Sequence, residues 1–207
     1  SYLHRLIHRN MLASLFPALM SIWCVTLWTD RPQQSPELPA LDGIQEVFRC
    51  DNGSLHFKSD APLEIIEARS NKMRGLIDPE AQTFAWAVDI KTFEGFNSPL
   101  QREHFNENYM ESSKYPKATF QGKIIETIDY KKDGTYTVRA KGKLNIHGVE
   151  QERIIRGQVT VKGQRMRVQA DFTVRLADHD ISIPRVVHQK IAEEIAVRVD
   201  ADMSWQN

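Results

Sequence analysis

The chain has 207 residues, of which 41% are hydrophobic and 26% are charged. This is the composition of an ordinary globular protein, and the length suffices for one barrel or sandwich with a core. Its 27 basic and 27 acidic residues give a formal net charge of zero. Such a balance provides no long-range attraction to polyanions, so we expect no nucleic-acid partner.

Residues 1–31 are predicted to be a signal peptide or a membrane anchor. Residues 11–28 contain no charged side chain, and Arg5 and Arg9 precede them. A basic lead before an apolar stretch is typical of secretory signals, and this length is near the lower limit for a membrane-spanning helix. A cleaved signal, an uncleaved tether through residues 11–28 and a lipid attached at Cys24 all stay open. Each of them exports the rest of the chain, so we expect a periplasmic or secreted protein, with or without an N-terminal membrane anchor.

A linker is predicted over residues 32–44, because this segment contains three prolines and few apolar residues. The folded domain is predicted over residues 45–207. Of the two cysteines, only Cys50 lies in this domain. If the N-terminal segment is removed, a disulfide within the remaining chain is excluded.

Alternation with a period of two is the strongest pattern in the domain. Apolar and polar side chains alternate over residues 136–146, 166–176 and 195–203. Such stretches are typical of strands with one face on a core and the other in water. Weaker patterns predict five further strands, at residues 54–58, 63–70, 83–90, 119–127 and 151–162.

Turn signals join these strands in antiparallel order. Glycine-containing turns at residues 132–134, 147–148 and 162–163 fit tight hairpins. Apolar residues near helical spacing predict a short helix within residues 99–113, and Pro184 favours a helical turn over residues 184–192. The pattern therefore predicts an all-β protein of eight antiparallel strands, closed as a barrel or folded as a sandwich, with one or two short helical segments.

The predicted inner faces of the strands mix small residues with aromatic ones. Small inward residues leave space that larger apolar side chains line, which suits an apolar ligand. The same mixture also fits a solid core in which small and large residues fill a tapering barrel. A larger side chain at Gly142 or Ala170 should block binding while the barrel still folds. The residues expected to line a cavity are Phe84, Trp86, Phe120, Ala140, Gly142, Leu144, Met166, Val168, Ala170 and Phe172.

Three stretches of the domain resemble the YceI-like family: residues 53–59, 102–120 and 142–149. The second ends in Tyr-Pro-Lys-Ala-Thr-Phe and the third contains Leu-Asn-Ile-His-Gly-Val, and the resemblance covers about residues 47–204. It implies an extended eight-stranded, lipocalin-like antiparallel barrel with a helix after the third or fourth strand. It also implies export in a bacterium to the periplasm or beyond.

The resemblance further implies an apolar lipid as the partner. Members of the family are associated with binding polyisoprenoids, including isoprenoid quinones, inside the barrel. We therefore expect a bound isoprenoid lipid or quinone and no required cofactor. The family has no catalytic motif, and the sequence contains no nucleophile elbow, phosphate loop or paired zinc motif. A binding protein is thus predicted rather than an enzyme, with the oligomeric state left open, a dimer included.

Three histidines are candidates for polar contacts. His104 lies in the predicted helical segment, where it either packs or caps near the barrel mouth or contacts a ligand head group. Asp178, His179 and Asp180 are the densest cluster of candidate metal ligands. Adjacent residues on a strand point to opposite faces, so these three could not all bind one ion there, and no metal site is predicted. A solvated loop is expected instead. His147, in a hairpin turn, is expected to hydrogen-bond the turn backbone.

Two other functions remain as alternatives to a lipid carrier. The first is a solid-core barrel that serves as a scaffold or interaction module. The second is an enzyme on a small lipid substrate that uses His104 or His179 as a base. A filled interior would favour the first. For the second, any reaction that is found should be abolished by His104→Ala or His179→Ala.

Overall fold

The structure is a computed structural model that describes residues 46–206, and the statements below concern this part of the chain. Its strands are β1 (Val47–Asp60), β2 (Ile65–Asp78), β3 (Thr83–Asp89), β4 (Lys117–Ile124), β5 (Gly134–Ile146), β6 (Val149–Lys162), β7 (Arg165–Arg175) and β8 (Glu194–Gln206). The helical elements are η1 (Ile90–Thr92), α1 (Pro99–His104), the π-helical turn η2 (Phe105–Tyr109), η3 (Leu176–His179) and η4 (Arg185–Val187). No helix within residues 46–206 is long and apolar enough to span a membrane.

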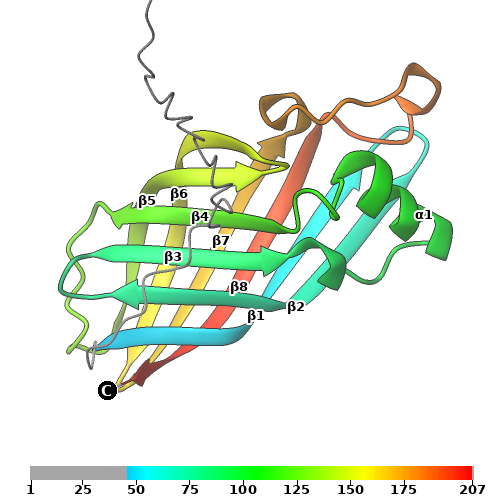
Figure 1. The fold of residues 1–207 in the computed structure, drawn as a ribbon. Helices are drawn as coiled ribbons and strands as arrows, with labels where there is room; N and C mark the ends of the chain where they lie inside the picture. Colours follow the sequence, from blue (N-terminus) through cyan, green and yellow to red (C-terminus); the bar gives the residue numbers. More distant parts are fainter. Residues whose placement is uncertain (1–45, 207) are drawn as a thin grey trace, which may run out of the picture. The chain divides into compact units, whose positions relative to one another are not determined.

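The eight strands form a closed barrel (Figure 1). Each strand pairs antiparallel with the next, and β8 pairs back with β1. The predicted eight-stranded antiparallel barrel with a short helix is therefore confirmed. β5 and β6 pair without interruption from Gly134 and Val161 to Ile146 and Val149.

The turn between β5 and β6 consists of two residues in left-handed backbone conformation. His147 has a φ of 54° and Gly148 a φ of 75°. Two successive positive φ values define the kind of tight turn whose twist matches that of the flanking strands. The hairpin predicted at residues 147–148 is thus present.

The strands differ from their predicted bounds mainly at irregular pairings. β1 begins at Val47, well before the predicted residue 54, because pairing continues across a bulge. The register of β1 against β2 shifts between Cys50 and Leu55, which breaks the alternation in the sequence. β4 ends at Ile124, short of the predicted residue 127.

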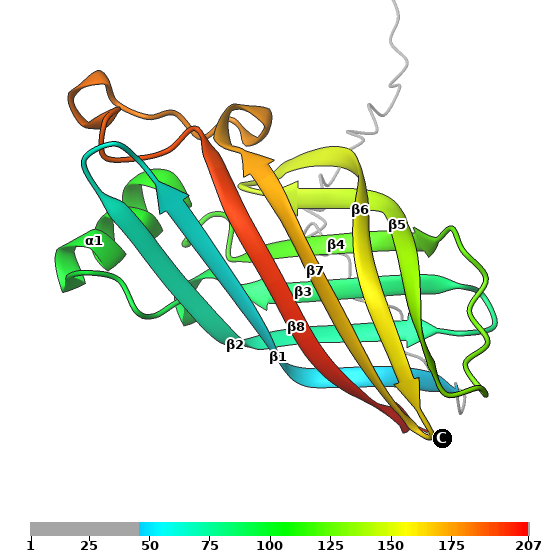
Figure 2. The ribbon, with the colours of Figure 1, turned by 180° about the vertical axis from the view of Figure 1, so that it is seen from behind.

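The barrel has two unlike ends (Figures 1 and 2). The end that we call the mouth carries the β1–β2 turn, the β3–β4 connection with α1, the β5–β6 turn and the β7–β8 connection with η4. The opposite end, which we call the closed end, carries the start of β1 and the end of β8. Both connections that contain helices therefore lie at the mouth.

Apolar side chains fill the interior at the closed end. Phe48 is almost fully buried, and its ring centroid lies 4.9 Å from that of Trp205 and 5.8 Å from that of Tyr130. Cys50, a buried free cysteine, belongs to the same core, and its burial raises the pKa of the thiol. The remaining members of this closed-end plug are Ile77, Val161, Met166 and Met203.

Candidate ligand-binding cavity

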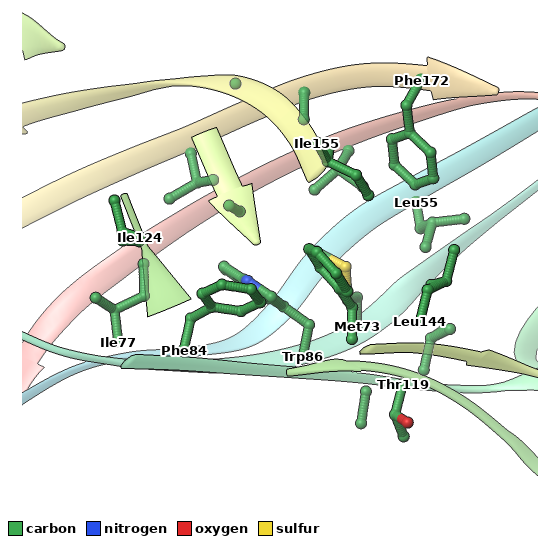
Figure 3. Close-up of a pocket in the computed structure, with 18 of the residues that line it drawn as sticks. Leu55, Met73, Ile77, Phe84, Trp86, Thr119, Ile124, Leu144, Ile155 and Phe172 are labelled. Carbon is green, nitrogen blue, oxygen red and sulfur yellow. The ribbon is translucent and has the colours of Figure 1, made fainter. Parts of the chain in front are cut away.

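An apolar cavity of about 120 Å³ lies inside the barrel, beyond the closed-end plug (Figure 3). All eight strands contribute to its wall, from Leu55 on β1 to Val199 on β8. Among the described residues that line this inner cavity none is charged, and Thr119 carries the only hydroxyl group. Such a wall offers an apolar molecule contact on every side and a charged one no partner.

Eight of the ten residues predicted to line a cavity border this space. They are Phe84, Trp86, Phe120, Ala140, Leu144, Val168, Ala170 and Phe172. Met166 lies deeper, in the closed-end plug, where it pairs with Val161 and Met203. Alternation assigned Met166 to the inside of the barrel but cannot separate the plug from the wall of the cavity.

Gly142 serves the close approach of two strands and does not border the inner cavity. It lies opposite Gly122 in the pairing of β4 with β5. A Cβ atom at Gly142 would lie 2.2 Å from the carbonyl oxygen of Gln121. A leucine there would push β4 and β5 apart, so the expectation that it fills the cavity of an intact barrel is wrong.

Two aromatic rings on β3 stand in the middle of the barrel (Figure 3). The ring of Phe84 contacts that of Phe120 at a centroid distance of 4.8 Å. The ring of Trp86 lies over Gly75, its partner on β2, where a Cβ atom would be 2.0 Å from the ring. The absent side chain at Gly75 therefore lets the indole lie against the wall instead of across the cavity.

A second cavity, of about 480 Å³, opens at the mouth. Its volume lies in the range of about 300–1,000 Å³ that is usual for small-molecule sites. It lies next to the inner cavity, since Leu55, Val88, Ala118, Leu144 and Phe172 border both. An apolar lining thus extends from the mouth into the middle of the barrel.

Four phenylalanines that no sequence pattern predicted to lie together form one side of the mouth cavity. The ring of Phe105 stacks on that of Phe57 at 5.4 Å and lies 5.0 Å from that of Phe96. The ring of Phe93 lies 5.5 Å from that of Phe57. Only Phe57 is on a strand, so period-two alternation could not find this cluster, which depends on how the β3–β4 connection folds over the barrel.

Most of the polar side chains that line the two cavities lie at the mouth. Ser59 accepts a hydrogen bond from the backbone N–H of Ala192 at 2.9 Å and is thereby satisfied. His104 borders the mouth cavity, as do Tyr109 and Lys190, and none of these three side chains has a hydrogen bond to another described residue. Burial raises the pKa of Tyr109, so its hydroxyl keeps its proton at neutral pH. His104 and Tyr109 thus bring polar groups without a described partner to the border of the mouth cavity.

His179 does not lie in a solvated loop. Its side chain is fully buried because η3 turns it inward, and its Nδ1–H donates to the carbonyl oxygen of Val149 at 3.1 Å. The ring borders neither cavity, which removes the geometric basis for a base at this position. Within residues 46–206 no cluster of three or more histidine, cysteine or acidic side chains could hold a metal ion.

His147 links two connections at the mouth rather than its own turn. Its Nε2 lies 2.6 Å from the Glu111 carboxylate and its Nδ1 lies 3.1 Å from the carbonyl oxygen of His179. The expected bond to the turn backbone is therefore replaced by contacts with the β3–β4 and β7–β8 connections. The Leu-Asn-Ile-His-Gly motif thus helps to fix the position of the mouth segments.

The closed eight-stranded antiparallel barrel with an internal apolar cavity has a lipocalin-like architecture. The sequence model of the YceI-like domain matches residues 52–203. That match spans most of the chain, and the protein therefore belongs to the YceI-like family. No curated protein sequence matches the chain.

Solved structures of related barrels share the fold at low sequence identity. A polyisoprenoid-binding domain from Saccharophagus degradans, implicated in plant cell wall breakdown, is 15% identical, with a TM-score of 0.64 over 79% of this chain and 99% of that one. BcnA from Burkholderia cenocepacia is 14% identical, with a TM-score of 0.61 over 72% of this chain and 95% of that one. A YceI protein from Campylobacter jejuni is 13% identical, with a TM-score of 0.50 over 87% and 94%.

Proposed function

We propose that this protein binds and carries or stores a long apolar molecule, an isoprenoid lipid or isoprenoid quinone, inside the barrel. The observation that supports the proposal is the pair of adjacent apolar cavities, at the mouth and inside the barrel, of which the inner one has no charged residue in its lining. A branched hydrocarbon chain matches such a wall by dispersion and by burial of its apolar surface.

The distribution of polar groups gives the ligand a direction. The inner cavity offers one hydroxyl, whereas Tyr109 and His104 border the mouth cavity without a described partner. A chain inserted tail first would keep its carbonyl or hydroxyl head beside these groups. The similarity to a polyisoprenoid-binding domain supports the ligand class.

The direct experiment is mass spectrometry of material extracted from protein purified without detergent from its native host. We expect an isoprenoid lipid or quinone in near-stoichiometric amount. A protein that carries no apolar molecule, and that binds neither added geranylgeraniol nor an added prenylated quinone, would contradict the proposal.

A matched pair of variants locates the ligand in the barrel. Ala170→Phe adds a ring that fills much of the inner cavity, whereas Thr173→Phe adds the same ring on the exposed outer face of β7. We expect Ala170→Phe to weaken binding of geranylgeraniol by about tenfold or more, equal to about 1.4 kcal/mol. Thr173→Phe should leave the affinity unchanged, and equal affinities of the two variants would place the ligand elsewhere.

Neither alternative function is favoured by an observation of this barrel. A scaffold with a solid core does not need the cavities at the centre and the mouth. An enzyme that uses His104 as its base should lose all turnover on replacement by alanine, whereas a head-group contact should lose only a small part of its affinity. We infer export to the periplasm as the cellular setting, which fractionation of the native host tests.

A further inference from the structure

Large apolar side chains that are exposed to solvent concentrate at the mouth. Within residues 46–206 there are six of them, at exposed fractions of 66% for Leu63, 49% for Ile65, 57% for Leu100, 89% for Val186, 42% for Ile125 and 55% for Ile154. The first four lie on the β1–β2 turn, at the first residue of β2, on α1 and on η4, all at the mouth (Figures 1 and 2). We call these four residues the mouth rim.

Hydrogen bonds hold the three segments of the mouth rim together. The backbone N–H of Leu63 donates to the carbonyl oxygen of Gln189 at 2.9 Å, which joins the β1–β2 turn to the segment after η4. The side-chain amide of Asn97 donates to the carbonyl oxygen of Ile65 at 2.9 Å, which joins the same turn to the start of α1. The rim is therefore one preformed surface rather than three independent loops.

The mouth rim is continuous with the proposed ligand site. Leu100 borders the mouth cavity itself, and Ile66 and Val187, which adjoin Ile65 and Val186, border it too. An exposed apolar surface that surrounds the opening of an apolar cavity is what a lipid leaving a bilayer would cross. Along this surface the hydrocarbon chain of the lipid could pass from bilayer to cavity without crossing water.

The charges around the rim are balanced. The three segments, residues 61–66, 99–104 and 184–193, together contain three basic residues (Arg102, Arg185, Lys190) and three acidic ones (Glu64, Glu103, Glu193). This balance gives no net attraction to anionic lipids and no net repulsion from them. Attachment would therefore depend on insertion of apolar side chains.

We propose that the mouth rim is a membrane-docking surface, which inserts its four apolar side chains into the interfacial region of a bilayer while ligand moves between bilayer and barrel. The proposal rests on the proposed function, since it supplies the route by which a water-insoluble molecule reaches the cavity. Apolar side chains that enter the headgroup boundary stabilise such attachment in proportion to the area buried.

The test compares two double variants in the full-length chain. Leu63→Gln with Val186→Gln removes two rim side chains that border neither cavity, and Ile125→Gln with Ile154→Gln removes two exposed side chains elsewhere. Residues 1–45 are kept in every variant, so their contribution is the same throughout. The measured rate is the transfer of a fluorescent isoprenoid alcohol from phosphatidylcholine vesicles to the protein.

We expect the rim variant to slow this transfer by about tenfold or more, because two of the four side chains that would insert into the bilayer become polar. The control variant should transfer at the wild-type rate, and adding phosphatidylglycerol to the vesicles should change neither result much. Equal rates for both variants would overturn the docking proposal.

Equilibrium binding of farnesol dispersed in water separates this proposal from the proposed function. The rim variant should bind dispersed farnesol as the wild type does, whereas failure of the wild type to bind it would count against the proposed function itself. Hydrogen exchange gives a local check: vesicles should protect residues 62–66, 97–104 and 184–190 but not residues 125–133. Protection of the same segments by increased protein concentration alone would identify a dimer interface instead, and would overturn the proposal.

Discussion

The two ends of the barrel are both lined by apolar side chains, but these side chains fill the closed end and surround a cavity at the mouth. At the closed end Phe48, Met166 and Met203 are almost fully buried in one apolar core. At the mouth the four phenylalanines around Phe105 are equally apolar, yet a cavity of about 480 Å³ remains between them and the strands. The long β3–β4 and β7–β8 connections cover the mouth without filling it. Apolar character therefore decides what faces inward, and the connections decide whether the inside is full.

The closed end should carry much of the stability of the barrel. Replacing Phe48 by alanine leaves a cavity in a packed core, and we expect the free energy of unfolding to fall by about 3–5 kcal/mol. Urea unfolding followed by tryptophan fluorescence measures the loss. Because Phe48 borders neither cavity, ligand affinity per folded molecule should not change. A loss well below 1 kcal/mol would mean that the plug is loosely packed.

At the mouth, a substitution should affect the free energy of unfolding less and the ligand affinity more than it does at the closed end. Phe105 stacks on Phe57 but is only partly buried. We expect Phe105→Ala to lower the free energy of unfolding by only about 1–2 kcal/mol. It should weaken isoprenoid binding by a larger factor than Phe48→Ala does, since its ring borders the mouth cavity. Unchanged affinity would move the ligand away from the phenylalanine cluster.

Alkaline pH should loosen the closed end before the mouth. Burial, and secondarily the charge of Asp78, raises the pKa of Tyr130 to about 12. The folded protein thus holds this proton more tightly than the unfolded chain, whose tyrosines titrate near pH 10. The stabilisation is present below about pH 10 and is lost as the pH rises toward about 12.

Unfolding free energies measured across this pH range, for the wild type and for Tyr130→Phe, isolate the contribution of one hydroxyl. That hydroxyl is buried and has no hydrogen-bond partner among the described residues, so Tyr130→Phe should not destabilise the protein at neutral pH. The variant should lose less stability than the wild type between pH 10 and 12. Parallel curves would show that Tyr130 ionises without opening the plug.

The sequence predicts the barrel well because its signal is local. The alternation over β5, β7 and β8 predicts these strands, and Gly148 predicts the turn after β5. Residue 142 and its neighbours also carry part of the family resemblance. The bulge in β1 was not visible, because an extra residue shifts the alternation and resembles the end of a strand.

The candidate site was predictable only along the strands. Ala170 and Phe172 border the inner cavity because alternation places them inside. Met166 obeys the same alternation but lies in the plug, and the position along the barrel axis that separates the two depends on packing from all strands. Phe93 and Phe105 lie on connections, where no period applies, so their approach to Phe57 follows from tertiary structure alone.

The smallest expected loss of stability concerns the hydrogen bond that joins the β7–β8 connection to β1 at the mouth. Ser59 is buried on β1, and its hydroxyl accepts the backbone N–H of Ala192 at 2.9 Å. Ser59→Ala leaves that N–H without its partner, which should cost about 1 kcal/mol. Ser204→Ala, on the exposed surface of β8, is the matched control and should cost almost nothing.

The location of the loss matters more than its size. If the mouth is held by separate polar links and the closed end by packing, Ser59→Ala should speed hydrogen exchange in residues 184–193 and leave the strands of the plug protected. Uniformly faster exchange throughout the barrel would instead mean that the two ends unfold as one unit. The segment released by Ser59→Ala carries Val186, so slower uptake of isoprenoid from vesicles by this variant would connect the polar link at the mouth to docking on the bilayer.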